Sequence, residues 1–182
     1  IDEAAQKVRV IHRGDTYYRY DNEYTGNITI PTSVTYNGTT YSVTEIGTCA
    51  FKGCTGLISV VLPNSITKIN EGAFSGCTGL VSIEIPNSVV AIGNGAFGNC
   101  VGLSEVIIPN SVTSIGSSAF SYCDGLTSVT IPNSVTSIGA GAFGRCDSLI
   151  SVTIGKSVAS MGDGAFGYCN ALLNQSFYDK VS

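Results

Sequence analysis

The sequence predicts an α/β repeat solenoid: a right-handed superhelix of short parallel strands and single-turn helices, with a β-hairpin cap at its N-terminal end. Two observations predict this fold. The pattern Ala-Phe-x-x-Cys-x-x-Leu occurs six times at a constant interval of 23 residues. Each interval also contains alternating apolar residues followed by apolar residues at helical spacing. A fixed period of this size is typical of units that bury their apolar face only by stacking on neighbours.

The first element of each unit is a short strand. In the stretch LTSVTIP, the apolar residues Val129 and Ile131 alternate with polar residues, which is strand spacing. Pro132 ends the strand because it has no backbone N–H for the ladder. A second extended stretch, SVTSI, follows and is expected to turn Val135 and Ile138 inward. The corresponding positions of the other units predict parallel strands at 59–62, 82–85, 105–108, 128–131 and 151–154.

The last element of each unit is expected to be a single helical turn, because Ala142, Phe143 and Cys146 follow helical spacing. A glycine such as Gly116 precedes this turn in most units, and Asn70 takes its place once. Gly and Asn tolerate a left-handed backbone, so the position is predicted to have a positive φ. The position comprises Gly47, Asn70, Gly93, Gly116, Gly139 and Gly162.

Six cysteines, one per unit, are predicted to stack inside the coil at about 4.8 Å per rung. The favoured interpretation is a column of small buried apolar side chains. Disulfides between rungs are less favoured because stacked side chains point the same way. The 23-residue spacing lacks the close thiolate pairs of a metal site, and the single His, His12, lies in the leading segment, so no metal is expected. The seventh cysteine, Cys49, is interpreted either as a tolerated small residue or as a partly exposed, reactive thiol.

The repeat pattern divides the chain into two parts. Residues 1–45 are predicted to form the N-terminal β-hairpin cap and a degenerate first unit. Residues 46–182 are predicted to form six 23-residue repeats, of which the last is degenerate. In that last unit Gln175 replaces an expected Val, and both a C-terminal cap and a longer native chain would explain the departure.

Two hairpins are predicted in the leading segment. Asn37-Gly38 lies between alternating arms, which is the strongest short hairpin signal, and Gly14-Asp15 lies between a second pair of arms. The second tip reads Arg13-Gly14-Asp15, the tripeptide by which many matrix proteins engage integrins. Gly-Asp is also ordinary turn chemistry, so an integrin ligand and a simple turn both remain open interpretations.

Composition disfavours several classes of function. The formal net charge is -4 and only 12% of residues are charged, which makes nucleic acid and acidic lipid poor partners. No uncharged apolar run reaches the roughly 18–20 residues of a membrane span, so membrane insertion is not expected. The repeats contain no His and no Gly-rich phosphate loop followed by Lys, so we expect neither an enzyme nor a bound cofactor. The oligomeric state is not indicated by any of these features.

The unit IPNSVTSIGSSAFSYCDGLTSV follows the order L-x-x-L-x-L of leucine-rich repeats and resembles the BspA-like leucine-rich repeats of bacterial and protist surface proteins. The resemblance covers residues 46–172 and extends back to about Ile28. It implies a leucine-rich-repeat superhelix, secreted or displayed on a cell surface. Members of this family mostly bind host or neighbouring-cell components, which implies a non-catalytic adhesion or protein-interaction module whose partner is a protein or glycan. The alternative is a structural spacer or stalk of a larger surface protein.

Exposed residues that break the repeat are the candidates for binding, because the invariant positions form the core. The position before each Cys carries Tyr122, Arg145 and Tyr168 in three consecutive units, so these side chains are expected to stack. Tyr and Arg are enriched at binding hot spots, although stacking for structure alone is the other interpretation. The outward face of the strands is predicted to carry a second patch, with a solvated strand face as its alternative, made of Val61, Glu84, Glu105 and Ile107.

Overall fold

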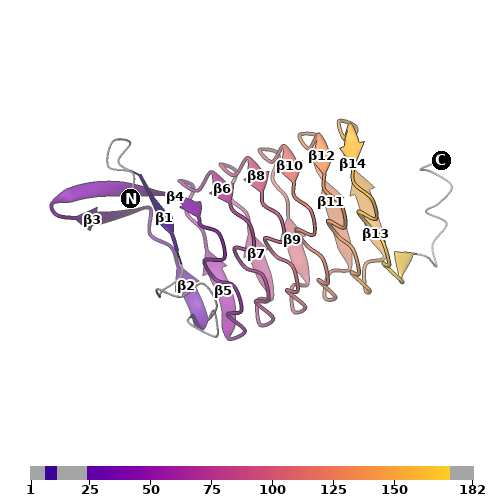
Figure 1. The fold of residues 1–182 in the computed structure, drawn as a ribbon, viewed down its shortest axis with the longest axis horizontal. Helices are drawn as coiled ribbons and strands as arrows, with labels where there is room; N and C mark the ends of the chain where they lie inside the picture. Colours follow the sequence, from indigo (N-terminus) through magenta and orange to yellow (C-terminus); the bar gives the residue numbers. More distant parts are fainter. Residues whose placement is uncertain (1–6, 12–23, 173–182) are drawn as a thin grey trace.

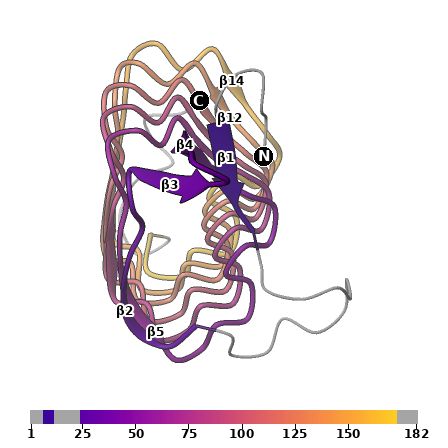
Figure 2. The same ribbon diagram turned by 90° about the vertical axis from the view of Figure 1, so that its left-hand side faces the viewer.

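The computed structural model describes residues 7–11 and 24–172, which form a parallel-strand solenoid. Successive 23-residue units follow one another along the coil, from β4 (Thr39–Ile46) at the N-terminal end to β14 (Ser160–Met161) at the C-terminal end (Figure 1). Figure 2 looks along the coil and shows the successive turns superposed. The predicted stacking of repeat units is therefore confirmed.

One sheet runs the length of the coil and is built from the second, shorter extended stretch of each unit. Its strands pair in parallel, for example Ser114 with Ser137 and Ile115 with Ile138. Val135 and Ile138 lie inside the coil, as predicted. The strands in order are β1 (Lys7–Val10), β4 (Thr39–Ile46), β6 (Lys68–Ile69), β8 (Ala91–Ile92), β10 (Ser114–Ile115), β12 (Ser137–Ile138) and β14 (Ser160–Met161).

The longer strands of each unit form separate parallel pairs on another side of the coil. The pairs are β2 with β5, β7 with β9, and β11 with β13. The predicted ranges 128–131 and 151–154 agree with the observed strands, and the other three are shifted or shortened by one or two residues. These strands are β2 (Gly26–Thr29), β5 (Leu57–Val61), β7 (Ser82–Glu84), β9 (Glu105–Ile107), β11 (Ser128–Ile131) and β13 (Ser151–Ile154).

The hairpin predicted at Asn37-Gly38 is confirmed. β3 (Ser33–Tyr36) pairs antiparallel with β4, and the two turn residues have φ of 48° and 76°, as a two-residue hairpin turn requires. β3 and the start of β4 extend beyond the coil at its N-terminal end (Figure 1). The capping role of this hairpin stays a prediction, and the second predicted hairpin, at Gly14-Asp15, lies outside the described residues.

The single-turn helices predicted between the strands are not formed, and the described residues contain no α-helix. In this segment, successive backbone N–H groups alternate between a carbonyl acceptor in their own unit and one in the next unit. The N–H of Ala119 donates to Gly116 O within its own turn at 3.3 Å, whereas the N–H of Phe120 donates to Ala142 O of the next unit at 2.7 Å. Because every second donor is used between units, the i→i−4 ladder of a helix cannot continue. The segment is instead a series of turns.

The positive φ predicted for the glycine column is wrong. Gly93 and Gly116 do not have a left-handed backbone. A Cβ on Gly116 would lie 2.6 Å from the backbone N of Asn94 in the preceding unit, so the approach of these two units requires a glycine at position 116. At the equivalent position, the Asn70 side chain donates a hydrogen bond from Nδ2 to Ile46 O at 2.8 Å. One column of left-handed residues lies two positions later in the unit, at Cys49, Gly72, Gly95, Ser118, Gly141 and Gly164, and a second lies at the position before each repeated Cys.

Columns of equivalent side chains fill the coil, among them a Phe column and a Cys column. Neighbouring rings in the Phe column lie 5.0–5.2 Å apart, centroid to centroid, and are tilted by only 1–7°. The column cysteines are buried free thiols, as predicted, and each also serves as a hydrogen-bond donor. The Sγ of Cys123, for example, lies 3.2 Å from the Phe97 carbonyl oxygen of the preceding unit and donates to it. Five consecutive units repeat this bond, so the column joins the units as well as filling space.

Candidate binding surfaces

The three residues Tyr122, Arg145 and Tyr168, here called the Tyr–Arg ladder, lie together on the surface of the coil. The Arg145 Cζ is 5.6 Å from the centre of the Tyr122 ring and 4.8 Å from that of Tyr168. The two tyrosines are 44% and 71% exposed. The stacking predicted from the sequence is therefore present, and each contact is within the range of a cation–π interaction.

The ladder is built on a left-handed backbone. Tyr122, Arg145 and Tyr168 have φ of 57°, 59° and 60°, whereas the first two units have glycine in this column, Gly53 and Gly76. A left-handed conformation costs a residue with a side chain about 1–2 kcal/mol, and glycine avoids that cost. The conformation is held by bonds between units, such as Tyr122 N–H to Gly144 O at 2.9 Å. Large side chains thus occupy positions where the backbone alone would favour glycine, and such strain is most common at functional sites.

Polar residues border the ladder. Asn99 extends the column by one unit, with a φ of 59°, and is exposed. Two residues after each ladder position, across the buried Cys, come the exposed residues Asp124, Asp147 and Asn170. Asn170 Nδ2 donates to Asp147 Oδ1 at 3.0 Å, which holds that carboxylate in place. The surface around the ladder therefore offers aromatic faces, a guanidinium, an amide and carboxylates.

The structure also brings the predicted strand-face residues together in part. Glu84 lies directly opposite Ile107 on the paired strands β7 and β9, and Glu105 lies opposite Ser82. Val61 lies on β5, the neighbouring strand, with 58% of its surface exposed, and Ile107 is 61% exposed. A groove of about 660 Å³ passes over Glu105 and Ile107 toward β11 and β13, so this face is hollowed rather than flat.

Other exposed apolar residues on the strand face were missed in the sequence. Ile58, Val81 and Ile150 each immediately follow a buried leucine and are about half exposed. For Ile58 a signal was available, since a residue next to an inward-facing one in a strand faces outward. Ile58 lies on β5 with Val61, whereas Val81 and Ile150 immediately precede β7 and β13, so they add exposed apolar area at the start of these strands.

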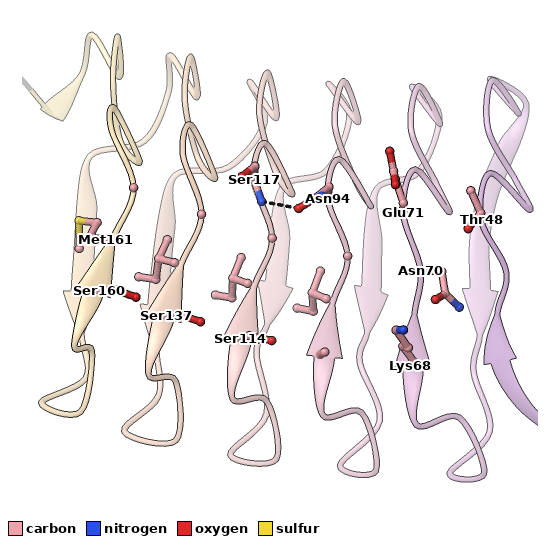
Figure 3. A pocket seen from close by; sticks show the side chains of 18 residues that line it. Thr48, Lys68, Asn70, Glu71, Asn94, Ser114, Ser117, Ser137, Ser160 and Met161 are labelled. Carbon is pink, nitrogen blue, oxygen red and sulfur yellow. Dashed lines mark hydrogen bonds between the residues drawn. The ribbon is translucent and has the colours of Figure 1, made fainter.

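A further groove of about 730 Å³ crosses the continuous sheet (Figure 3). Ser114, Ser137 and Ser160 line it in successive units, and the Asn94 side chain accepts a hydrogen bond from the Ser117 N–H at 2.9 Å. Small residues form no motif, so the sequence did not point to this groove. Its lining combines hydroxyl groups and glycine backbone with the larger side chains of Lys68, Asn70, Glu71 and Met161.

The other candidates are the leading tripeptide, a metal site, a membrane span and reactive thiols, and the described residues support none of them as a binding site. Arg13, Gly14 and Asp15 lie outside the described residues. No group of three or more His, Cys, Asp or Glu that could hold a metal is found among residues 7–11 and 24–172. Within the same ranges, no helix has the length and apolarity to cross a bilayer. Burial raises the pKa of the Cys100 thiol to about 12, which makes it a poor nucleophile, and Cys49 is half-buried.

Comparison with known proteins places these features in a family. Residues 44–173 match the model of the BspA type leucine rich repeat region, in six copies. A leucine-rich repeat protein from Bacteroides ovatus is 37% identical over 80% of this chain, with a TM-score of 0.74. A leucine rich cell surface protein from Faecalibacterium prausnitzii is 35% identical over 80% of this chain, with a TM-score of 0.70. The T. pallidum leucine rich repeat protein is 31% identical over 92% of this chain and 78% of its own length, with a TM-score of 0.72.

The chain spans only 38% of the B. ovatus protein and 46% of the F. prausnitzii protein. No curated protein matches the sequence. The similarity therefore concerns the repeat domain, and its surfaces have to be interpreted from their own chemistry.

Proposed function

This chain belongs to the BspA-type leucine-rich repeat family, and on that premise we propose that it is a non-catalytic adhesion module, displayed outside a bacterial cell, that binds a component of another cell. The similar F. prausnitzii protein is named a cell surface protein, which supports this location. The repeat scaffold supports a binding role because it holds surface side chains on a rigid frame and so limits the entropy lost on docking.

The observation that carries the proposal is the Tyr–Arg ladder. Its three large side chains remain exposed on a backbone that favours glycine, so folding alone does not explain them. Exposed Tyr and Arg on rigid elements are the residue types that most often dominate binding energy. We therefore assign the contact surface to Tyr122, Arg145 and Tyr168, with the strand-face patch as a second surface.

The proposal is tested with beads coated with the chain and incubated with mammalian epithelial cells and with bacterial cells. The double variant Tyr122→Ser, Arg145→Ser is expected to weaken attachment by about tenfold or more, equivalent to about 1.4 kcal/mol. Tyr36→Ser, which removes an exposed Tyr from the hairpin, is the matched control and should attach as the wild type does.

Two further results bear on the proposal. If Asp15→Ala abolishes attachment while the double variant does not, the contact lies in the leading tripeptide and the ladder assignment is wrong. If the wild-type chain attaches to neither kind of cell, a spacer role replaces the adhesion module.

A further inference from the structure

We propose that the Tyr–Arg ladder, extended by Asn99, binds a neutral, linear β-1,4-linked glycan that lies along the coil axis with about one sugar per unit. This inference rests on the proposed function, because it names the class of ligand for the same surface. It is carried by the spacing of the units, the chemistry of the exposed groups and the local charge.

The spacing of the units suits an extended sugar chain. Stacked side chains in neighbouring units lie 5.0–5.2 Å apart, as the Phe column shows. An extended β-1,4-linked chain of hexoses advances by close to this distance with each ring. The column of Asn99, Tyr122, Arg145 and Tyr168 can therefore present one side chain to each of four consecutive sugars.

The exposed groups are those that bind sugars. The Arg145 guanidinium covers one face of each tyrosine ring, and the other face and the ring edges can contact the C–H groups of a pyranose through weak contacts that add up over several rings. The guanidinium of Arg145 lies over both rings and presents fixed N–H donors to hydroxyl groups. The carboxylates of Asp124 and Asp147 border the row and accept hydrogen bonds from neighbouring hydroxyl pairs.

The local charge favours a neutral ligand. Arg145 is the only cation among the residues of the row, its faces are already engaged by two rings, and Asp124 and Asp147 are close by in sequence and exposed. A sulfated, phosphorylated or sialylated chain would bring further negative charge to this border and would be repelled. A protein partner would require a broader apolar centre than one column of side chains supplies. Val101, two residues after Asn99, is the exposed aliphatic residue that borders the row, whereas Val61 and Ile107 lie on the strand face.

The experiment is calorimetric titration of the chain with the neutral pentamers of β-1,4-linked glucose and β-1,4-linked N-acetylglucosamine. Maltopentaose, which has the same sugar in a curved α-1,4-linked chain, controls for shape, and a heparin pentamer controls for charge. At least one β-1,4-linked pentamer should bind at least tenfold more tightly than either control. The pentamer should also bind more tightly than the corresponding dimer.

Two variants assign the binding to the row. Tyr122→Gly and Tyr168→Gly remove one ring each without disturbing the backbone, since glycine occupies this column in the first two units. Each should weaken pentamer binding by about tenfold, while Tyr36→Ser should leave it unchanged. Circular dichroism confirms that the variants are folded.

The outcomes separate this inference from the proposed function. If neither β-1,4-linked pentamer binds, or if both glycine variants bind it as the wild type does, the glycan inference is overturned. Loss of cell attachment in the double variant, combined with no pentamer binding, would point to a protein ligand and leave the adhesion role intact. Unchanged cell attachment in that variant would overturn the assignment of the cell contact to the ladder, whereas the titrations alone decide the glycan inference.

Discussion

Replacing Tyr122 by Gly and, separately, by Ala measures the strain that the ladder imposes on its backbone. Both changes remove the phenol ring and its contact with Arg145. They differ in the Cβ, which Ala keeps and Gly lacks. With a φ of 57° at this position, the comparison isolates the cost of a side chain in the left-handed conformation.

The magnitude follows from two opposing terms. The left-handed conformation costs Ala about 1–2 kcal/mol, which Gly avoids. Gly in turn loses about 0.5–1 kcal/mol relative to Ala, because its unfolded chain has more conformational freedom. The Gly variant should therefore be more stable than the Ala variant by roughly 0–1.5 kcal/mol.

Urea denaturation of both variants measures this difference, and Thr130 supplies the matched control. Thr130 is exposed on β11 and does not have a left-handed backbone, so Thr130→Gly should be less stable than Thr130→Ala by about 0.5–1 kcal/mol. The free energy of unfolding of the Gly variant minus that of the Ala variant should thus be about 1–2 kcal/mol higher at position 122 than at position 130. Equal differences would refute the strain argument and remove the main reason for treating the ladder as functional.

Four further predictions concern the core and the thiols. Phe120→Ala should cost about 3–5 kcal/mol, because rings on both sides prevent the cavity from collapsing, and a loss below about 1 kcal/mol in urea denaturation would contradict the stacked core. Gly116→Ala should cost about 1–3 kcal/mol or prevent folding, since its Cβ would meet the preceding unit, and unchanged stability would show that the units can separate. A thiol reagent at pH 8 should modify only Cys49 in the native chain and all seven cysteines after denaturation, and rapid labelling of the native column would mean that the coil opens. Burial raises the pKa of Cys100 from 9.0 to about 12, so the folded chain keeps a proton that the unfolded chain releases, and stability measured against pH should fall between pH 9 and 12. That decline should be smaller in Cys100→Ala.

The sequence by itself determined the repeat, the inward-facing columns and most of the longer strands. Phe120 and Val135 recur with the period of the coil, and their burial follows because each unit can hide them only against its neighbours. The proximity of Tyr122 and Arg145 followed in the same way, since equivalent positions of adjacent units must lie side by side. A periodic sequence identifies the equivalent residues of its units, and the stacking of the units brings equivalent residues of neighbouring units into contact.

Only the tertiary structure decided how each unit bonds to the next. Phe120 and Cys123 do follow helical spacing, but the Phe120 N–H binds the following unit, so no helix forms. Gly116 is needed for a close approach between units rather than for a left-handed turn, and the left-handed strain lies instead under Tyr122. These features depend on distances between units separated by 23 residues in sequence, and residue identity within one unit does not encode those distances. The local pattern therefore fixed the columns, while the geometry between units fixed the backbone on which the candidate site is built.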